Sequence, residues 1–419
     1  MAEPSRPLRM YFPAHGQQMF RAMRDPRLQV CREERGSREP DLVIFPIHQN
    51  LRALDQIGAL PEWVKARLES GEAGVLFDAS QEGRPHRPPN SQALHAALRQ
   101  MQVDPARAIY VTQNRSYDIG YRAWCAEAGV RPMTVLAYDY WIKKFFSDYE
   151  TTGEAVFEQR LHAYRARKPA RERRFVSLNW TARPTKVMFL LKLLKDRLWD
   201  QGFISFGGFG VILEHKGRTL AGFAKDLRAL PGFEDMAASL SPLLPRLEAY
   251  GEVSFGAMPP EDQPREHHTA LVGDLALPEF ERSWFSVVTE SEMAAQPSRV
   301  TEKPFKSLVG FHPTLIFGNP GSLPLLGEFG FQSFAPMFDE AYDAEPDPRR
   351  RFDMAYKQVV RLCRMDEAEL ARREGAISEV LEFNARWGLT RLPGIYRTRI
   401  DAELLNAVQA RLAAGPVNA

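Results

Sequence analysis

Two groups of charged residues in the second half of the chain have the types and spacing of an anion-binding site. Arg183 and Lys186 follow the apolar run RFVSLN and open an amphipathic segment, where a separation of three residues puts them on one face of a helix. Glu290 leaves the apolar run SWFSVVT, and Glu302 and Lys303 come twelve residues later. A helix N-terminus attracts anions through its free N–H groups and its dipole. Two cations at such a terminus therefore predict a diphosphate site.

The adjacent Glu302 and Lys303 would suit the two halves of a nucleotide. A carboxylate accepts hydrogen bonds from a ribose diol, and an ammonium group holds a phosphate as a point charge. Asn179 ends the apolar run before Arg183 and is a further candidate for binding the same ligand. The competing interpretation is that these charged side chains are simply solvated, because adjacent Glu and Lys residues are common on protein surfaces.

The first half of the chain offers candidates for a general base. Asp78 and Glu82 lie just beyond the apolar run in VLFDASQEG, and a carboxylate there could take a proton from a hydroxyl group. His15 in PAHGQQ and His48 in PIHQN are alternative bases or acceptor-binding residues. The structural alternatives are a turn cap for Asp78 and a solvated loop position for Glu82.

The arrangement of apolar segments predicts the elements that position these residues. Continuous apolar runs alternate with helical patterns, which is typical of parallel sheets covered on both faces. The sequence therefore predicts an α/β protein with two Rossmann-like domains that face a cleft. Ligands of such sheets bind outside the carboxyl ends of the strands. The predicted divisions are an acceptor-binding domain (1–163), a basic linker (164–174), a nucleotide-binding domain (175–348) and a helical tail that packs across the domains (349–419).

Composition narrows the classes of protein that fit. The 419 residues carry 55 basic and 53 acidic side chains, and this near balance argues against a nucleic-acid-binding protein. The three cysteines form no CxxC pair, which fits a reducing compartment. No run resembles a signal peptide or a membrane span, so we expect a cytoplasmic protein. The basic segment is interpreted as a solvated linker, with attraction to the inner face of an anionic membrane as the sharper alternative.

The segment from Ser283 to Asp343 resembles the nucleotide-sugar-binding half of GT-B glycosyltransferases, especially the fucosyltransferase-like and exostosin-like groups. The shared features are FSVVTES with its acidic exit, then VTEK, then HPTLIFGNPGSLPLLGEFGFQSF, then FDEAYD. The resemblance extends to the strand and the Arg/Lys helix at 175–186. It implies a transferase that moves a sugar from a nucleotide-sugar donor to a glycan or glycolipid acceptor, as in the synthesis of bacterial surface polysaccharides.

The resemblance also implies roles for individual residues. Glu302 would bind the ribose, Lys303 the phosphates, and Arg183 would offset the charge of the diphosphate, while Glu290 would lie near the transferred sugar. No DxD motif occurs, so we expect an enzyme that needs no metal and no cofactor besides its donor. A non-catalytic binding subunit derived from such an enzyme remains the alternative. A nucleotide-dependent oxidoreductase is disfavoured, because FGGFG does not match GxGxxG.

Overall fold

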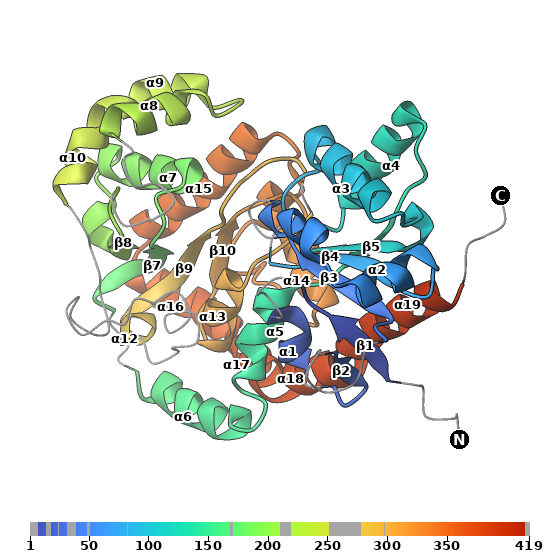
Figure 1. Ribbon diagram of the computed structural model, residues 1–419. Coiled ribbons are helices and arrows are strands. Elements are labelled where there is room, and N and C mark those ends of the chain that lie inside the picture. The colour runs from blue at the N-terminus through green and yellow to red at the C-terminus, as the bar shows by residue number, and fades with distance from the viewer. Residues whose placement is uncertain are drawn as a thin grey trace. The chain divides into compact units, whose positions relative to one another are not determined.

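The chain forms two compact α/β units (Figure 1). The first contains Met1–Ser147 and Pro393–Ala419, and the second contains Asp148–Leu392. This computed structural model describes residues 7–13, 18–23, 25–31, 39–47, 51–81, 83–167, 171–209, 219–250, 278–296 and 298–414. Every strand pair in the described residues is parallel, so the predicted α/β class is confirmed.

The first unit has a six-stranded sheet in the order β2-β1-β3-β4-β5-β6. The strand order reverses direction between β1 and β3, which makes a topological switch point. The strands are β1 (Leu8–Tyr11), β2 (Leu28–Val30), β3 (Leu42–Pro46), β4 (Gly74–Ala79), β5 (Ala108–Thr112) and β6 (Thr134–Ala137). The helices are α1 (Gln18–Met23), a 3-10 helix (Arg52–Ala59), α2 (Glu62–Glu69), α3 (Pro88–Gln100), a 3-10 turn (Pro105–Arg107), α4 (Tyr117–Ala128), α5 (Tyr140–Ser147) and α19 (Asp401–Ala413).

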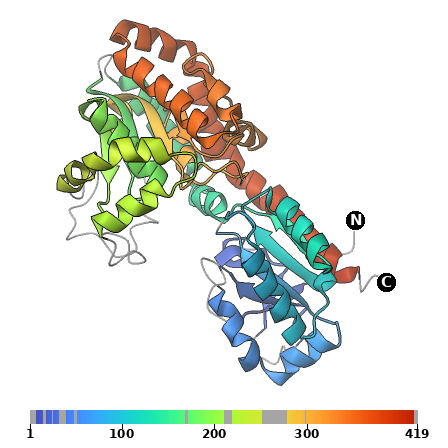
Figure 2. The same cartoon turned by 90° about the horizontal axis from the view of Figure 1, so that it is seen from above.

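Both faces of this sheet are buried, which explains why its strands are continuous apolar runs. Along β3, Val43 and Phe45 belong to one core with α2, α3 and α4, whereas Leu42 and Ile44 belong to a second core with α1 and α5. The alternation follows from the period of two along a strand. The last helix, α19, adds its apolar residues to the second core and lies along the sheet in both views (Figures 1 and 2).

A buried ion pair fixes α19 within the first unit. Lys143 of α5 lies 2.7 Å from one carboxylate oxygen of Asp401, and the hydroxyl of Tyr138 donates to the other oxygen over 2.7 Å. Lys143 and Asp401 are 3% and 1% exposed. The C-terminal segment is therefore part of the core of the first unit, whereas α15, α16 and α17 of the predicted tail belong to the second unit.

The second unit has a four-stranded sheet in the order β10-β9-β7-β8, with its switch point between β7 and β9. Its strands are β7 (Arg173–Asn179), β8 (Gly202–Phe206), β9 (Ser283–Thr289) and β10 (Thr314–Phe317). Its helices are α6 (Gly153–Ala166), α7 (Pro184–Lys195), 3-10 turns Trp199–Gln201 and Ser241–Leu243, α8 (Leu220–Arg228), α9 (Glu234–Leu240), α10 (Leu244–Ala249), α12 (Pro278–Glu281), α13 (Lys303–Val309), α14 (Ser322–Glu328), a 3-10 helix (Glu340–Ala344), α15 (Pro348–Arg364), α16 (Glu367–Ala376) and α17 (Ser378–Arg386). A π-helical turn (Trp387–Arg391), α18 (Leu392–Ile395) and a second π-helical turn (Tyr396–Ile400) connect α17 to α19.

Two segments differ from their predicted structure. The sequence FQSF (331–334) predicts a final strand after the preceding helix, but the structure has no strand there. Instead, the side-chain amide of Asn384 bonds both the N–H and the carbonyl of Gln332, so α17 takes the place of a neighbouring strand. In the basic linker, Arg167 and Arg171 are not solvated, because both pair with Glu374 of α16. Within the described residues, no helix is long and apolar enough to cross a membrane.

The buried pair generates the first prediction. Asp401→Ala should lower the free energy of unfolding by about 3–5 kcal/mol, because it leaves the Lys143 ammonium buried without a partner. Glu62→Ala, which breaks the exposed Glu62–Lys65 pair of the same unit, should cost less than about 1 kcal/mol. Urea unfolding measures both. The double variant Lys143→Met/Asp401→Leu should be more stable than Asp401→Ala, and equal costs for Asp401→Ala and Glu62→Ala would contradict this role.

Candidate functional site

The candidate site lies at the carboxyl ends of β7 and β9. These strands flank the switch point of the second sheet, where parallel α/β sheets bind their ligands. β7 leads into α7, and β9 leads toward α13. Right-handed crossovers in opposite directions from the switch point put these helices on opposite faces of the sheet. Accordingly, α7 packs with α15, as in the ring contact between Phe189 and Tyr356, and α13 packs with α17.

Glu290 anchors the loop that carries the other charges. It is 3% exposed, and its carboxylate accepts hydrogen bonds from the N–H of Thr301 over 3.0 Å and from the Thr301 hydroxyl over 2.8–2.9 Å. Burial raises the pKa of Glu290, but Lys303 and the bonds from Thr301 outweigh it and leave that pKa below its ordinary value. The carboxylate is therefore charged at neutral pH, and its bonds fix the start of α13.

Lys303 and Glu302 lie side by side at this fixed point. The Lys303 ammonium is 2.9 Å from the Thr301 hydroxyl oxygen, 3.4 Å from Glu302 and 3.7 Å from Glu290. Burial lowers the pKa of Lys303, but Glu302 and Glu290 outweigh it and leave the pKa above its ordinary value. The Lys303 side chain is 27% exposed. It is thus a cation at neutral pH, and a ligand can reach it.

The N-terminus of α7 presents polar groups without partners. Pro184 occupies the first helical position, and neither Thr185 nor Lys186 has an intrahelical acceptor for its backbone N–H. The Thr185 hydroxyl is buried and has no hydrogen-bond partner among the described residues. The side chains of Arg183 and Lys186 form no hydrogen bond or ion pair with any described residue. This end of the helix therefore offers two cations, a hydroxyl and free N–H groups to an anion.

The pKa of Lys186 is strongly lowered. Lys186 is 3% exposed, and its pKa falls to about 7 because burial disfavours the charge and because Lys303 and Arg183 repel it. Glu290 and Glu302 oppose this shift in part. These interactions show that the structure brings together five residues that the sequence singled out.

Arg351 and Gly318 support the loops of the site in different ways. Arg351 of α15 is 1% exposed and donates to the carbonyl oxygens of Gly318, over 2.9 Å, and Met293. These carbonyls belong to the loops that follow β10 and β9. A Cβ at position 318 would lie 3.1 Å from Cγ of Glu290, so glycine leaves the space that the buried carboxylate occupies.

The other predicted residues are placed differently. Asn179 is fully buried, and its amide bonds Ser177 over 2.8 Å and accepts from Thr289, so it joins β7 to β9 within the sheet. Asp78 is 2% exposed, and its carboxylate accepts the N–H of Ser80 over 3.0 Å in the turn after β4. Three further candidates, His15, His48 and Glu82, lie outside the described residues.

The sequence did not single out Thr185, Thr301 or Arg351. Thr185 carries the clearest signal, since it lies in the first turn of a helix that begins with Pro184. Thr301 stands directly before the Glu-Lys pair, but only the fold shows that its hydroxyl connects Glu290 to Lys303. Arg351 is one of several basic residues at the start of α15 and has no distinguishing local pattern.

The comparisons with known proteins add no relatives. No protein-family model matches the chain, and no curated protein or solved structure matches it either. Within the residues that the structure describes, no group of His, Cys, Asp and Glu side chains is arranged to hold a metal ion.

The environment of Lys186 predicts an unusual titration. In NMR spectra of protein labelled at lysine Cε, one ammonium group should titrate near pH 7 and should vanish from Lys186→Met. Titration of every lysine above pH 9 would contradict the burial of this charge.

The same shift determines how stability depends on pH. The folded pKa of about 7 lies below the unfolded value of 10.5, so the unfolded chain binds more protons between these values. Stability should therefore rise with pH across this window. Lys186→Met should remove that increment and should stabilise the protein by about 1–4 kcal/mol at pH 6. Urea unfolding at pH 6 and pH 9 measures both effects, and an unchanged slope would argue against the assignment.

Proposed function

We propose that the protein is a glycosyltransferase that moves a sugar from a nucleotide-sugar donor to a hydroxyl group of a glycan or glycolipid. The observation that carries the proposal is the cluster of Arg183, Lys186 and Lys303 at the switch point of the second sheet. Two of these cations have no partner among the described residues, and a helix N-terminus with free N–H groups lies beside them. A diphosphate would satisfy all of these groups at once.

The proposed chemistry needs charge stabilisation on the leaving group. The acceptor oxygen bonds to the anomeric carbon and gives its proton to a base, while the bond from that carbon to the diphosphate breaks. The diphosphate keeps the electron pair and gains negative charge. Lys303, Arg183 and Lys186 would stabilise this charge without a metal, because fixed cations in a site with little water interact strongly.

The remaining residues receive supporting roles. Glu302 would accept hydrogen bonds from the ribose, since its carboxylate is 15% exposed beside Lys303. Glu290 was expected near the transferred sugar, but it is buried and its oxygens bond Thr301. We therefore propose that it positions Thr301 and Lys303 rather than contacting the donor. Two Rossmann-like units are also the parts from which a GT-B enzyme is built, and this supports the proposal at the level of fold alone.

A binding subunit without catalytic activity is the second candidate. It is favoured by one observation, namely that the described candidate base, Asp78, is buried and bonded to the turn after β4. Sugar transfer distinguishes the two candidates, because both would bind the donor and only the enzyme would consume it.

Replacing Lys303 by alanine and replacing Glu302 by alanine should affect nucleotide and nucleoside affinity in different ways. Lys303→Ala should weaken UDP or GDP about tenfold to a hundredfold and free nucleoside little, because only the diphosphate meets the ammonium group. Glu302→Ala should weaken nucleotide and nucleoside by similar factors, since the ribose is common to both. Calorimetry measures these affinities. Lys195→Ala also removes one positive charge, but at the far end of α7, and it should change neither affinity.

The activity itself is tested with a panel of UDP-, GDP- and CMP-sugars, with and without EDTA. Release of nucleoside diphosphate or CMP should be detected for at least one donor and should persist in EDTA. Lys303→Ala should reduce it, and Lys195→Ala should not. Donor binding without turnover across an acceptor panel would support the binding subunit, and absence of any nucleotide binding would refute both candidates.

A further inference from the structure

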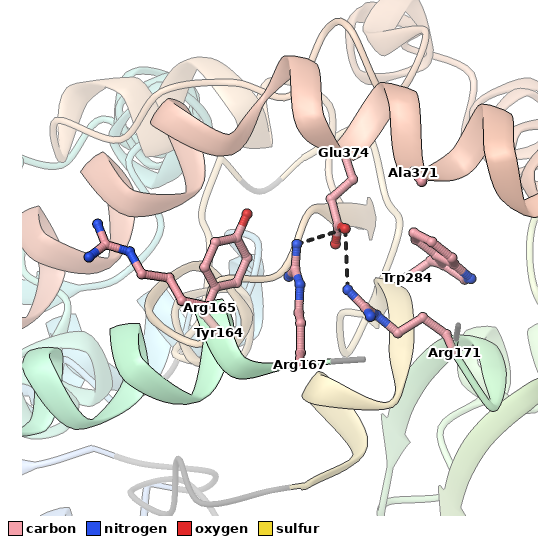
Figure 3. A pocket seen from close by; sticks show the side chains of 7 residues that line it. All are labelled: Tyr164, Arg165, Arg167, Arg171, Trp284, Ala371 and Glu374. Carbon is pink, nitrogen blue, oxygen red and sulfur yellow. Dashed lines mark hydrogen bonds and ion pairs between the residues drawn. The ribbon is translucent and has the colours of Figure 1, made fainter. Parts of the chain in front are cut away.

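A cavity lined by several arginines lies at the opposite edge of the second sheet from the candidate site (Figure 3). Its volume is about 290 Å³. Arg171 comes two residues before β7, Trp284 is the second residue of β9, and Glu374 reaches in from α16. Tyr164 and Arg167 line the cavity at the end of α6. All five residues belong to the second unit.

The cavity is well separated from the candidate nucleotide site. Trp284 and Glu290 are six residues apart along an extended strand, which corresponds to roughly 20 Å. The first site lies beyond the carboxyl ends of the strands and the cavity lies at their amino ends. A ligand of the cavity would therefore be a different molecule from the sugar donor, and the inference stands independently of the proposed function.

An Arg–Glu–Arg arrangement forms the centre of the cavity. One oxygen of Glu374 lies 2.7 Å from Arg167 and 3.3 Å from Arg171, and Figure 3 shows the carboxylate between the two guanidinium groups. The guanidinium carbon of Arg167 also lies 3.7 Å from the ring centre of Tyr164, and that of Arg171 lies 4.9 Å from the ring centre of Trp284. Two cations against one carboxylate leave a net charge of +1.

Several polar atoms of these residues are buried and have no hydrogen-bond partner among the described residues. They are Nε and Nη1 of Arg171, Nε1 of Trp284 and the second carboxylate oxygen of Glu374. Arg171 and Trp284 are 8% and 1% exposed. Buried polar atoms are nearly always hydrogen-bonded, because leaving one without a partner destabilises the folded protein. All four belong to residues that line one cavity, so a molecule bound there is a candidate partner for them.

The unpartnered atoms define the chemistry of that ligand. Three are N–H donors, which need oxygen acceptors, and the fourth is a carboxylate oxygen, which needs a donor. A ligand with several acceptor oxygens and one hydroxyl group would satisfy all four atoms, and the net charge of +1 favours an anion. The small volume, near the lower limit for ligand pockets, also requires a small molecule. We propose that this cavity is a binding site for hydrogen phosphate, which donates its P–OH proton to Glu374 and accepts from Arg171 and Trp284.

The wild-type protein tests this proposal through two anions of similar size. At pH 7 inorganic phosphate always carries a proton, whereas sulfate carries none, so only phosphate can satisfy Glu374. Calorimetry at constant ionic strength should give a Kd of about 1 mM or tighter for phosphate. Sulfate should bind at least about tenfold more weakly, because it places an acceptor against the carboxylate oxygen. Equal affinities would mean that Glu374 does not select a protonated anion, and absence of phosphate binding would mean that the cavity holds no anion; either result overturns the proposal.

Three variants assign the binding to this cavity. Trp284→Phe keeps an aromatic ring and removes the N–H donor, so phosphate should bind about tenfold more weakly. Arg165→Ala is the matched control, because Arg165 lines the cavity but points away from Glu374 and pairs with Glu382 (Figure 3). Lys303→Ala should also leave phosphate affinity unchanged. Circular dichroism and thermal unfolding confirm that each variant is folded.

Loss of phosphate binding in Lys303→Ala but not in Trp284→Phe would place the anion at the carboxyl edge instead and would refute the proposed site. A similar loss in Arg165→Ala would indicate non-specific attraction to basic residues and would refute it as well. If Trp284→Phe does not fold, the comparison of phosphate with sulfate in the wild-type protein still decides.

Discussion

The charged edge of the second unit depends on one buried carboxylate, Glu290. Its charge is retained because Thr301 donates two hydrogen bonds and Lys303 lies within 3.7 Å. These bonds determine where the chain turns into α13, and they place Lys303 and Glu302 at the surface of the site. Gly318 and Arg351 complete the arrangement, since one leaves space for the carboxylate and the other braces the adjoining loops.

This arrangement destabilises the charged form of a cation that Glu290 does not pair. Lys186 is buried beside Lys303 and Arg183 at the positive end of a helix dipole, and the depressed pKa of Lys186 records that conflict. Folding alone gives no reason to keep a cation there, because an apolar side chain of similar size would pack without the penalty. A conflict of this kind is typical of binding sites, where an anion removes it when it binds.

The sheets of both units have a switch point in their strand order, but the polar groups at their carboxyl edges are paired differently. In the first unit, Arg115 forms a bidentate pair with Asp139, and the side chain of Asn114 bonds the backbone of Arg84 and Ser116. Such bonds hold the loops after β5 and β6 in place. In the second unit, the cations of α7 have no such partners among the described residues. The described charges after β5 and β6 are therefore paired with one another, whereas Arg183 and Lys186 of the second unit have no such partner among the described residues.

Local sequence patterns were sufficient for the elements and for part of the site. Apolar runs and turn residues predicted the parallel strands, and the rule for carboxyl ends selected Arg183, Lys186, Glu302 and Lys303, which the fold brings together. These features depend on periodicity and on strand direction, and both are properties of short segments. The start of α7 could also be predicted from local sequence, because Pro184 marks a first helical turn.

Only the tertiary structure decided which polar groups have partners. Arg167 and Arg171 looked like a solvated linker, but Glu374, some two hundred residues away, pairs with both. FQSF has the composition of a strand, yet Asn384 bonds its backbone instead of a neighbouring strand. Lys186 and Arg183 have similar local surroundings, and only packing buries the lysine. Burial and partnership arise from contacts between distant segments, and a local pattern contains no information about which segments will meet.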